Sequence, residues 1–486
     1  MLRTFSIFGL AIVMLGAIAA SPVPLAAPTA SAPQNSPEGA IGALERNRKT
    51  DPAALVKYVN DKDPVVAARG CIAIGRLQNP AGNQTLVAVL TDTKRSDAVR
   101  AAAAFALGLI GSTSSLDPLT RAVRGDAPPI AAMAANALGR IGGAAAIDAL
   151  WPLLNDPDAT VRAQAAVSLG ESGYTGAPAI DFAHRKVAGD ALASNIFAER
   201  DPEVRWREAW ALARGYYQNE APALRRLLSD DGELERMFGV AGLGRLHDRS
   251  YALPIRLLAT DRAWRVRVAV RDALAQLHDP TKVDVKAPAV PAYDLATPQP
   301  VASTAPFGAH PQVAIVTGKG VIVLELFPDA APYSVDNFLT LTDRGFYNNL
   351  TYFRVIENFV VQGGDPKNTG DGDPGYTIPA ELNPIEQLTG IISYGLNYDP
   401  KANVPLVDSA GSQYYITESP QLHLDRGFTV FGRVVRGLAV VDAIAPQPGN
   451  APADVAKRVY RCQPVTPQTD DVETKLRSVE IGYDAQ

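Results

Sequence analysis

Tyr-Phe-Arg-Val-Ile-Glu-Asn-Phe-Val-Val-Gln-Gly-Gly-Asp, residues 352–365, is the most informative stretch of this 486-residue chain. Its β-branched and aromatic residues predict a strand or bent strand that ends at the turn Gly363-Gly364. One cation, Arg354, lies among these apolar neighbours, and an unpaired buried charge is costly. The residues alone leave two interpretations open. Arg354 pairs with a carboxylate of the protein, or its partner is a ligand.

Three further blocks accompany this stretch. Gly411-Ser412-Gln413-Tyr414-Tyr415-Ile416-Thr417 and the run 423–434 follow it, and Ala331-Pro332, Asn337-Phe338 and Gly345-Phe346-Tyr347 precede it. In this order, across residues 310–485, the four blocks resemble the cyclophilin family of peptidyl-prolyl cis/trans isomerases. Four ordered blocks are far more specific than any single short motif.

The resemblance implies a fold for residues 309–486, namely a closed antiparallel β-barrel of eight strands with two capping helices. The sequence agrees with it: residues 313–316 and 321–326 alternate around a Gly318-Lys319-Gly320 turn, as in a β-hairpin. Residues 334–344 have a helical pattern. Residues 447–470 read as a loop before a last strand at 478–483.

The resemblance also implies the site. Arg354, Phe359 and Gln362 match the family's catalytic positions. The matching substrate-binding positions are Val360, Gly395, Gln413, Tyr415, His423, Leu424 and Phe428. No cofactor or metal is implied, and the Asp-rich loop 365–373 lacks the spacing of an EF-hand.

Rotation about an Xaa-Pro bond must cross about 18–20 kcal/mol because the amide C–N bond has double-bond character. This reaction needs no acid, base or nucleophile. A guanidinium at position 354 can donate toward the prolyl nitrogen as amide resonance is lost, which stabilises the twisted transition state more than the planar ground state.

Three features depart from the family pattern. Phe353 stands where most members have a histidine, and His423 stands where many have a tryptophan, so we expect weakened cyclosporin binding. About eight extra residues lie between Ser393 and Gln413, which leaves the match of Gly395 to the groove wall open.

Residues 44–279 repeat. A small residue closes each apolar helical run at 75, 108, 139, 170, 213, 244 and 275, in steps of 33, 31, 31, 43, 31 and 31 residues. The unit resembles HEAT-like repeats, about seven of them, which stack into an all-α solenoid because one pair of helices cannot bury its own apolar face. The 43-residue step predicts an extra loop or turn near 173–195 that breaks the regular stack.

Arginines recur at one position of the repeat, namely Arg100, Arg162, Arg205 and Arg267. We expect them to form a polar ladder with aspartates or backbone carbonyls; a basic strip for an acidic partner is the alternative. Solenoid surfaces commonly bind proteins, so a protein partner on this surface is a further expectation by analogy.

The N-terminal segment and the segment between the two predicted domains each have a characteristic composition. Met1-Leu2-Arg3 and an apolar run to residue 20 predict a signal peptide, and residues 21–43 a disordered leader. The protein is then exported, periplasmic or extracellular, and bound to a membrane only if that segment stays uncleaved. Residues 280–308 predict a Pro-rich linker stiff enough to hold two domains apart. The net charge of −5 indicates no nucleic-acid partner.

These observations lead to one hypothesis and one alternative. The protein is a peptidyl-prolyl isomerase that acts on proline-containing segments of exported proteins, and its solenoid binds clients or partners. In the alternative, the protein is a scaffold or assembly factor that binds proline segments without needing to turn them over.

Overall fold

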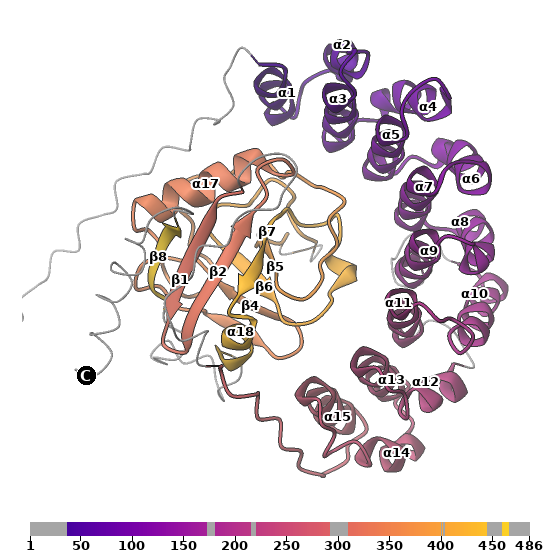
Figure 1. The fold of residues 1–486 in the computed structure, drawn as a ribbon, viewed down its shortest axis with the longest axis vertical. Coiled ribbons are helices and arrows are strands. Elements are labelled where there is room, and N and C mark those ends of the chain that lie inside the picture. Colours follow the sequence, from indigo (N-terminus) through magenta and orange to yellow (C-terminus); the bar gives the residue numbers. More distant parts are fainter. Residues whose placement is uncertain are drawn as a thin grey trace, which may run out of the picture.

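The computed structural model describes residues 36–172, 180–214, 220–291, 310–399, 401, 404–444 and 459–465. In that part of the chain, a curved stack of helix pairs encloses a β-sheet domain (Figure 1). The inner layer of the stack faces the sheet domain, and its helices are α3 (Pro64–Arg76), α5 (Asp97–Ile110), α7 (Pro128–Ile141), α9 (Ala159–Ser172), α11 (Pro202–Ala213), α13 (Glu233–Arg245) and α15 (Trp264–Gln276).

The outer layer consists of shorter helices. They are α2 (Val56–Val59), α4 (Asn83–Thr91), α6 (Leu116–Gly125), α8 (Ala144–Leu150), α10 (Phe182–Asn195), α12 (Ala221–Leu227) and α14 (Ala252–Arg256). Short 3-10 turns precede or follow several of these helices, at Pro52–Leu55, Pro80–Gly82, Thr113–Ser115, Trp151–Asn155 and Arg249–Tyr251. The predicted solenoid is confirmed, and each predicted repeat supplies one inner helix.

The repeating small residues lie where neighbouring inner helices approach most closely. A Cβ atom on Gly108 would lie 2.8 Å from the Cα of Ala137, and one on Gly75 would lie 2.6 Å from the Cα of Ala106. Backbones this close leave no room for a larger side chain. The period that is visible in the sequence is therefore the spacing of the helix crossings.

The predicted break at the 43-residue step is wrong for the inner layer. A Cβ atom on Gly170 would lie 2.9 Å from the Cα of Ala211, so α9 and α11 are in contact like the other neighbours. Part of the extra length forms α10, whose 14 residues are twice the 7 of α8. Residues 173–179 lie outside the described part.

The predicted arginine ladder is confirmed. Arg100 pairs with Asp126 at 2.7 Å, Arg162 pairs with Glu199 at 2.6 Å, and Arg205 pairs with Asp230. Arg267 donates to the carbonyls of Asp261 and Asp284, both at 2.7 Å. These guanidinium groups serve the stacking of repeats.

The predicted leader extends too far. Helix α1 (Pro37–Arg46) begins inside it, capped by Ser36, whose side chain accepts a hydrogen bond from the Gly39 N–H at 3.0 Å. Ile41 is fully buried in the solenoid core, which supplies the apolar contact that orders this helix. The predicted signal peptide and residues 21–35 lie outside the described part.

The sheet domain is antiparallel and eight-stranded, in the order β3-β4-β6-β5-β7-β2-β1-β8. Its strands are β1 (Gln312–Thr317), β2 (Gly320–Leu326), β3 (Arg354–Ile356), β4 (Val360–Gly363), β5 (Ile391–Tyr394), β6 (Tyr414–Thr417), β7 (Val430–Arg436) and β8 (Val459–Val465). The sheet curves into a half-barrel (Figure 1), and its outermost described strands are β3 and β8. The predicted antiparallel sheet of eight strands is thus confirmed, and closure between β3 and β8 is not among the described pairings.

Two helices and a short turn complete this domain. Helix α17 (Pro332–Asp343) contacts β8, helix α18 (Leu438–Ile444) contacts β2, and a 3-10 turn spans Leu422–Leu424. The interior is aromatic: Phe338 is surrounded by Tyr347, Tyr414 and Phe431, with ring centroids 5.0–5.6 Å apart. Among the described residues, no helix is both long and apolar enough to cross a membrane.

The last described strand of the sheet lies where the sequence predicted a loop. Residues 459–465, which were predicted as loop, form β8 and pair with β1 in antiparallel register. The strand pairs with an edge of β1, and its Val459 and Cys462 side chains are buried in the core of the sheet domain. The strand predicted at 478–483 lies outside the described part.

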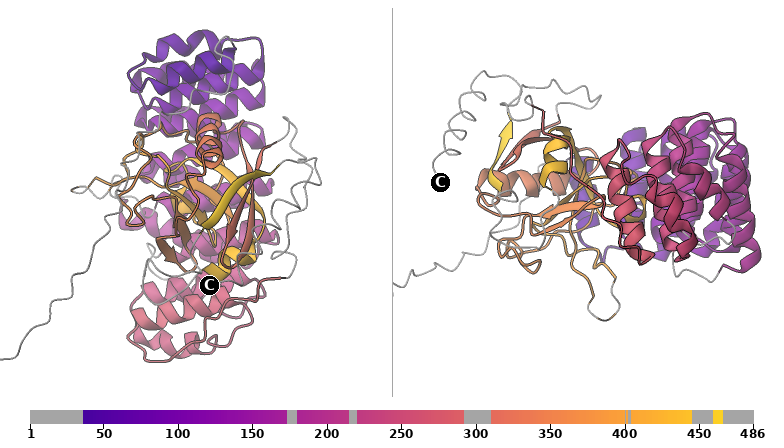
Figure 2. Two further views of the ribbon diagram at one scale, coloured as in Figure 1. Left: turned by 90° about the vertical axis from the view of Figure 1, so that its left-hand side faces the viewer. Right: turned by 90° about the horizontal axis from the view of Figure 1, so that it is seen from below.

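The linker does not hold the domains apart. The sheet domain lies within the concave side of the solenoid (Figures 1 and 2), and residues 280–291 run between them without helix or strand. Val283 packs on the solenoid core, and Val290 packs on the sheet-domain core. Leu422 of the sheet domain is itself part of the solenoid core. Residues 292–309 are not described.

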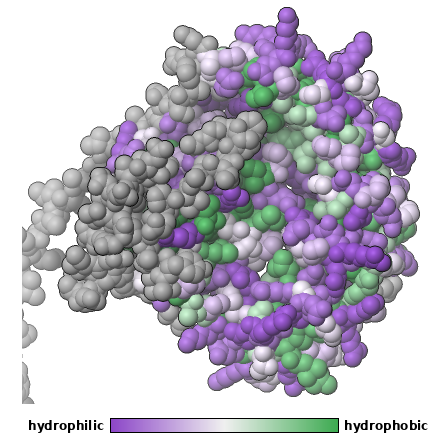
Figure 3. Space-filling view, viewed as in Figure 1, coloured by the Kyte–Doolittle hydropathy of each residue, from purple (hydrophilic) through white to green (hydrophobic). Residues whose placement is uncertain are grey.

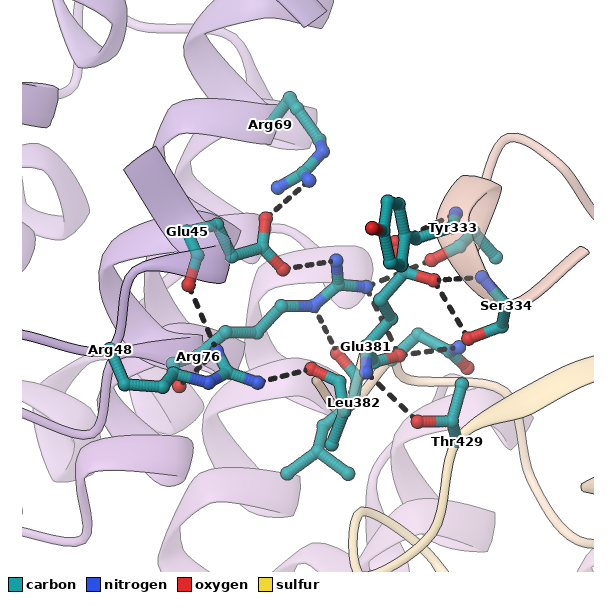
Figure 4. Close-up of polar contacts among 12 residues, drawn as sticks. Glu45, Arg48, Arg69, Arg76, Tyr333, Ser334, Glu381, Leu382 and Thr429 are labelled. Atoms are coloured by element: carbon teal, nitrogen blue, oxygen red, sulfur yellow. Dashed lines mark hydrogen bonds and ion pairs between the residues drawn. The ribbon is translucent and has the colours of Figure 1, made fainter. Parts of the chain in front are cut away.

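Buried charges join the domains near α3 (Figure 4). The Arg76 guanidinium donates to the carbonyls of Leu382 at 2.7 Å and Ala330 at 2.8 Å, and it pairs with Glu45 at 2.8 Å. Glu381 accepts hydrogen bonds from the N–H and hydroxyl of Ser334, at 2.7 and 2.8 Å, and thereby caps α17. Burial by itself raises the pKa of Glu45, but Arg69 and Arg76 outweigh it and lower the pKa to about 2.

Candidate functional site

The predicted catalytic residues lie in one row across the sheet. Arg354 of β3 is opposite Gln362 of β4, and Gln362 is opposite Tyr415 of β6. Residues at one register position of neighbouring strands point to the same face. The alternate residues Val361 and Ile416 point the other way and are fully buried in the domain core. Strand alternation thus separates a core face from a groove face.

The groove has an apolar base. Val360, Tyr415 and Phe428 form a buried cluster, and Phe359, Leu396 and Leu424 pack against it. The rings of Tyr415 and Phe428 meet edge to face with centroids 5.7 Å apart. The structure therefore brings together the apolar residues predicted to hold the proline ring, and adds Leu396.

Arg354 is exposed at the edge of this base. Its guanidinium carbon lies 5.4 Å from the centroid of the Phe359 ring, and Nη1 donates to Oε1 of Gln362 at 3.2 Å. No ion pair to Arg354 occurs among the described residues. Of the two interpretations of this arginine, the geometry favours the second, in which the guanidinium faces a ligand.

A chain of amides orients Arg354. Nε2 of Gln362 donates to Oε1 of Gln413 at 3.2 Å, and Nε2 of Gln413 donates to the carbonyls of Gly370 and Gly372 at 2.8 and 2.9 Å. The loop that carries these carbonyls wraps around the buried Asp365 carboxylate, which accepts from the backbone N–H of Lys367 at 2.7 Å and Thr369 at 2.8 Å. The Asp-rich loop therefore has a structural role in this arrangement.

Gly395, whose match to the groove wall was left open, lies beside Gln362 and Gln413. Its N–H donates to the Gln413 carbonyl at 2.8 Å, and a Cβ atom there would lie 3.0 Å from Nε2 of Gln362. A side chain at this position would press on the amide that orients Arg354. The extra residues after it form an excursion that returns to the solenoid, where Asp408 pairs with Arg48 at 2.8 Å.

His423 forms one rim of the groove. Its ring stacks on Phe359, with centroids 5.9 Å apart and planes inclined by 16°. The side chain keeps solvent exposure, yet the protein atoms around the ring, together with the positive Arg214 and Arg245, lower the pKa of His423 to about 3. The imidazole is therefore neutral at physiological pH.

The solenoid holds two segments that form the groove. The turn between β3 and β4 is fixed to α15, because Asn358 donates to the Arg265 carbonyl at 2.8 Å and Glu357 pairs with Arg271. The segment 420–428 is fixed to α7 and α9, because Arg426 donates to the Asn136 carbonyl at 2.9 Å and pairs with Glu171. Arg354, Phe359, His423 and Leu424 are thereby positioned against helices of another domain.

Sequence reasoning missed the solenoid residues beside the groove. Trp210, Arg214, Phe238 and Arg245 approach His423 from α11 and α13 or the residue that follows α11. Their spacing is that of ordinary repeat positions, so no local pattern distinguishes them. Only the docking of the two domains brings them to the site.

Comparison with known proteins agrees with this geometry. Residues 312–463 match the family model described as cyclophilin type peptidyl-prolyl cis-trans isomerase, and residues 52–131 and 93–170 match the model of HEAT repeats. A peptidyl-prolyl cis-trans isomerase of Synechococcus elongatus is 41% identical over 144 residues, which cover 27% of this chain and 92% of the relative. Peptidyl-prolyl cis-trans isomerase B of Bacillus subtilis is 46% identical over 119 residues, 24% of this chain and 78% of the relative.

Among solved structures, a cyclophilin-type isomerase of Cryptosporidium parvum is similar to 32% of this chain over 98% of its own length. It is 28% identical in sequence, with a TM-score of 0.29.

Proposed function

Since this chain belongs to the cyclophilin-type peptidyl-prolyl cis-trans isomerases, we propose that its substrates are proline-containing segments of exported polypeptides and that its solenoid takes part in binding them. The isomerase activity belongs to the family. The class of client, the compartment and the role of the solenoid are the proposal.

The single observation that carries the catalytic assignment is the position of Arg354. Its guanidinium is exposed, is held by Gln362 and lies beside an apolar seat of Phe359, Val360 and Tyr415. A proline ring in that seat places its nitrogen near the guanidinium. As the Xaa-Pro bond twists, the nitrogen lone pair becomes an acceptor, and an N–H of Arg354 stabilises the transition state.

Gln362 and Gln413 have a different task. Their amides form the chain that fixes Arg354, and they also present donors and acceptors to the substrate backbone on the same face. Holding the flanking backbone while the prolyl bond rotates converts binding energy into a bias toward the twisted geometry.

Two features of the N-terminal sequence support export. The charged start and the apolar run of residues 7–20 have the pattern of a cleaved signal. If so, N-terminal sequencing of the protein from its own host should find a first residue near Ser21. An uncleaved segment would instead leave the protein attached to a membrane.

The docking of the isomerase domain limits which surfaces of the solenoid a separate partner can bind. That surface is covered by the isomerase domain, through contacts such as Arg76 with Leu382 and Phe105 with Leu382. A separate partner therefore has the outer helices and the rims of the stack to bind.

Completion of the half-barrel of the isomerase domain into a closed barrel also stays a prediction.

The test is isomerisation of an Xaa-Pro tetrapeptide by the full-length protein, its Arg354→Ala variant and a matched control, Arg433→Ala. Arg433 is an exposed arginine of β7 that pairs with Glu325. We expect Arg354→Ala to lower kcat/KM about 100-fold, the loss typical of one transition-state donor, and the control to leave it unchanged. A folded wild-type protein without a rate gain would instead favour a scaffold that binds proline segments.

A further inference from the structure

The turn between β3 and β4 carries Phe359, which packs on the apolar base of the groove, and this turn is held by Glu418. The Glu418 N–H donates to the Phe359 carbonyl at 3.0 Å, and Oε2 of Glu418 accepts from the Asn358 N–H at 2.8 Å. Oγ of Ser419 and Nε2 of Gln421 donate to the Asn358 carbonyl, at 2.6 and 2.7 Å. The Glu418 side chain is fully buried. One segment, residues 418–421, therefore holds the backbone of the turn.

The turn depends on these contacts because it lies at an edge of the sheet. Strand β3 pairs with β4 and has no second neighbour among the described strands. A hydrogen bond from the Phe359 N–H to the Ile356 carbonyl at 3.0 Å closes the turn, and Asn358 has a φ of +58°. A hairpin of two strands has little stability of its own in water. The position of this hairpin relative to the rest of the groove is therefore set by its neighbours.

The solenoid reaches the holding segment through Arg265 of α15. Nε of Arg265 donates to the Glu418 carbonyl at 3.0 Å, and Nη2 pairs with Asp442 of α18 at 2.7 Å. The Arg265 carbonyl accepts from Nδ2 of Asn358 at 2.8 Å. The side chains of Arg265 and Asp442 are 15% and 7% exposed, so their ion pair is largely shielded from water. One solenoid residue therefore joins the turn, the segment that holds it and a helix of the isomerase domain.

The position of Phe359 matters because its ring lies beside the catalytic guanidinium. The guanidinium carbon of Arg354 is 5.4 Å from the centroid of this ring. Arg354 stabilises the twisted bond only if the prolyl nitrogen comes within reach of one of its N–H groups. A shift of the turn changes the distance from the apolar base to the guanidinium, whereas Val360 and Tyr415, on β4 and β6, still bind the proline ring. Such a shift lowers kcat more than it raises KM.

We propose that Arg265 is a positioning residue of the isomerase, which acts through Glu418 and Asn358 to hold Phe359 at its working distance from Arg354. The Arg265 guanidinium binds Glu418 and Asp442, so its effect on the reaction is exerted through these partners. The rate of isomerisation then depends on a side chain that the solenoid supplies. The proposal rests on the isomerase activity of the groove, and it adds a role of the solenoid in catalysis to its proposed role in binding clients.

The first test compares kcat and KM for an Xaa-Pro tetrapeptide among the full-length protein, Arg265→Met and Arg48→Met. Methionine keeps an unbranched apolar stem and removes the guanidinium, while the backbone carbonyl of residue 265 still accepts from Asn358. Arg48 is the matched control, because it also joins the domains through a carboxylate, Asp408 at 2.8 Å, and a carbonyl, that of Ala380 at 2.6 Å. We expect Arg265→Met to lower kcat about tenfold and to change KM less than about twofold, since a misplacement of about 1 Å can cost about 100-fold. Arg48→Met should keep both constants.

The second test uses Glu418, because a conservative variant there keeps what a disruptive one removes. Burial, together with the nearby Asp442, raises the pKa of Glu418 well above its usual value, so the carboxyl is uncharged and similar to an amide. Glu418→Gln still offers an oxygen to the Asn358 N–H and should keep the wild-type kcat. Glu418→Leu has no acceptor and should lower kcat about tenfold, as Arg265→Met does. A role in packing alone would give the opposite order, because leucine fills an apolar interior better than glutamine.

Each outcome supports or overturns the positioning role. An unchanged kcat in Arg265→Met, an equal loss in Arg48→Met, or a loss confined to KM overturns it. So does a Glu418→Gln variant that is as slow as Glu418→Leu. If neither Arg265→Met nor Glu418→Leu folds, Arg265→Lys takes their place and a lower kcat is again expected, because a single ammonium that pairs with Asp442 lacks the fork that also reaches the Glu418 carbonyl. Absence of any rate gain from the wild-type protein is a separate result, which contradicts the isomerase itself.

Discussion

At the α3 end of the interface between the domains, Arg76, Glu45 and Glu381 are each at most 5% exposed, whereas at the α13 end Arg245, Asp272 and His423 are open to solvent. Both ends use arginines of inner helices. At the first end every Arg76 contact is made by the protein itself. At the second end the arginines border a cavity. Buried, satisfied charge fixes the position of a domain, whereas the α13 end of the same interface stays open to solvent beside the groove.

Removing the buried arginine at the α3 end of the interface should have the largest effect on the stability of the protein. Arg76→Ala leaves the buried Glu45 with Arg69 as its remaining ion-pair partner and removes donors from the Leu382 and Ala330 carbonyls. Removing one partner of a buried ion pair costs about 3–5 kcal/mol. We expect this loss in the free energy of unfolding, measured by urea titration.

The control for that variant is Arg256→Ala, which removes an exposed pair with Asp279 on the outer layer. It should change the free energy of unfolding far less than Arg76→Ala does. Equal effects of the two substitutions would mean that the buried network does not hold the domains together.

The smallest expected effect is that of pH on kcat/KM through His423, which lies at the α13 end of the interface. Because the folded pKa of His423 is lowered to about 3, the imidazole takes up no proton between pH 8 and 5, and kcat/KM for an uncharged peptide should show no step from it. In the unfolded chain the same histidine protonates near its ordinary pKa. Its contribution to stability is thus complete above about pH 6.5 and is lost as the pH falls from there.

The measurement is the NMR shift of the His423 ring protons, with His423→Gln to assign the signal. A ring that titrates near pH 6.5 would contradict the packing described for the cavity wall. At the other end Glu45, with its pKa lowered to about 2, loses its stabilising contribution only as the pH falls below about 4.5. The two ends therefore respond in different pH ranges.

The groove could be predicted from sequence because its residues lie in blocks that resemble the cyclophilin family, and strand register shows why they meet. Once Arg354, Gln362 and Tyr415 occupy matching positions of three paired strands, they must share a face. The solenoid was equally visible, since each close helix crossing requires a small residue at a fixed period. The solenoid prediction depended on local spacing, and the groove prediction depended on the resemblance.

The docking of the domains could not be predicted in this way. Arg76 and Arg426 bind backbone carbonyls of the other domain, and every residue type carries such a group. Strand β8 was missed because residues 447–470, which include it, are rich in Pro, Asn and Thr and read as a loop. The cavity beside the groove depends on this docking and was missed with it.

The central claim is that the solenoid and the isomerase domain form one folded unit that shares a substrate site. Its most direct test is to place a protease site within residues 292–308, cleave the folded protein and examine the two fragments by size-exclusion chromatography under native conditions. We predict that they elute together and keep the isomerase activity of the intact chain. Separation of the fragments, with an isomerase fragment that is as active alone as the intact chain, would contradict the claim.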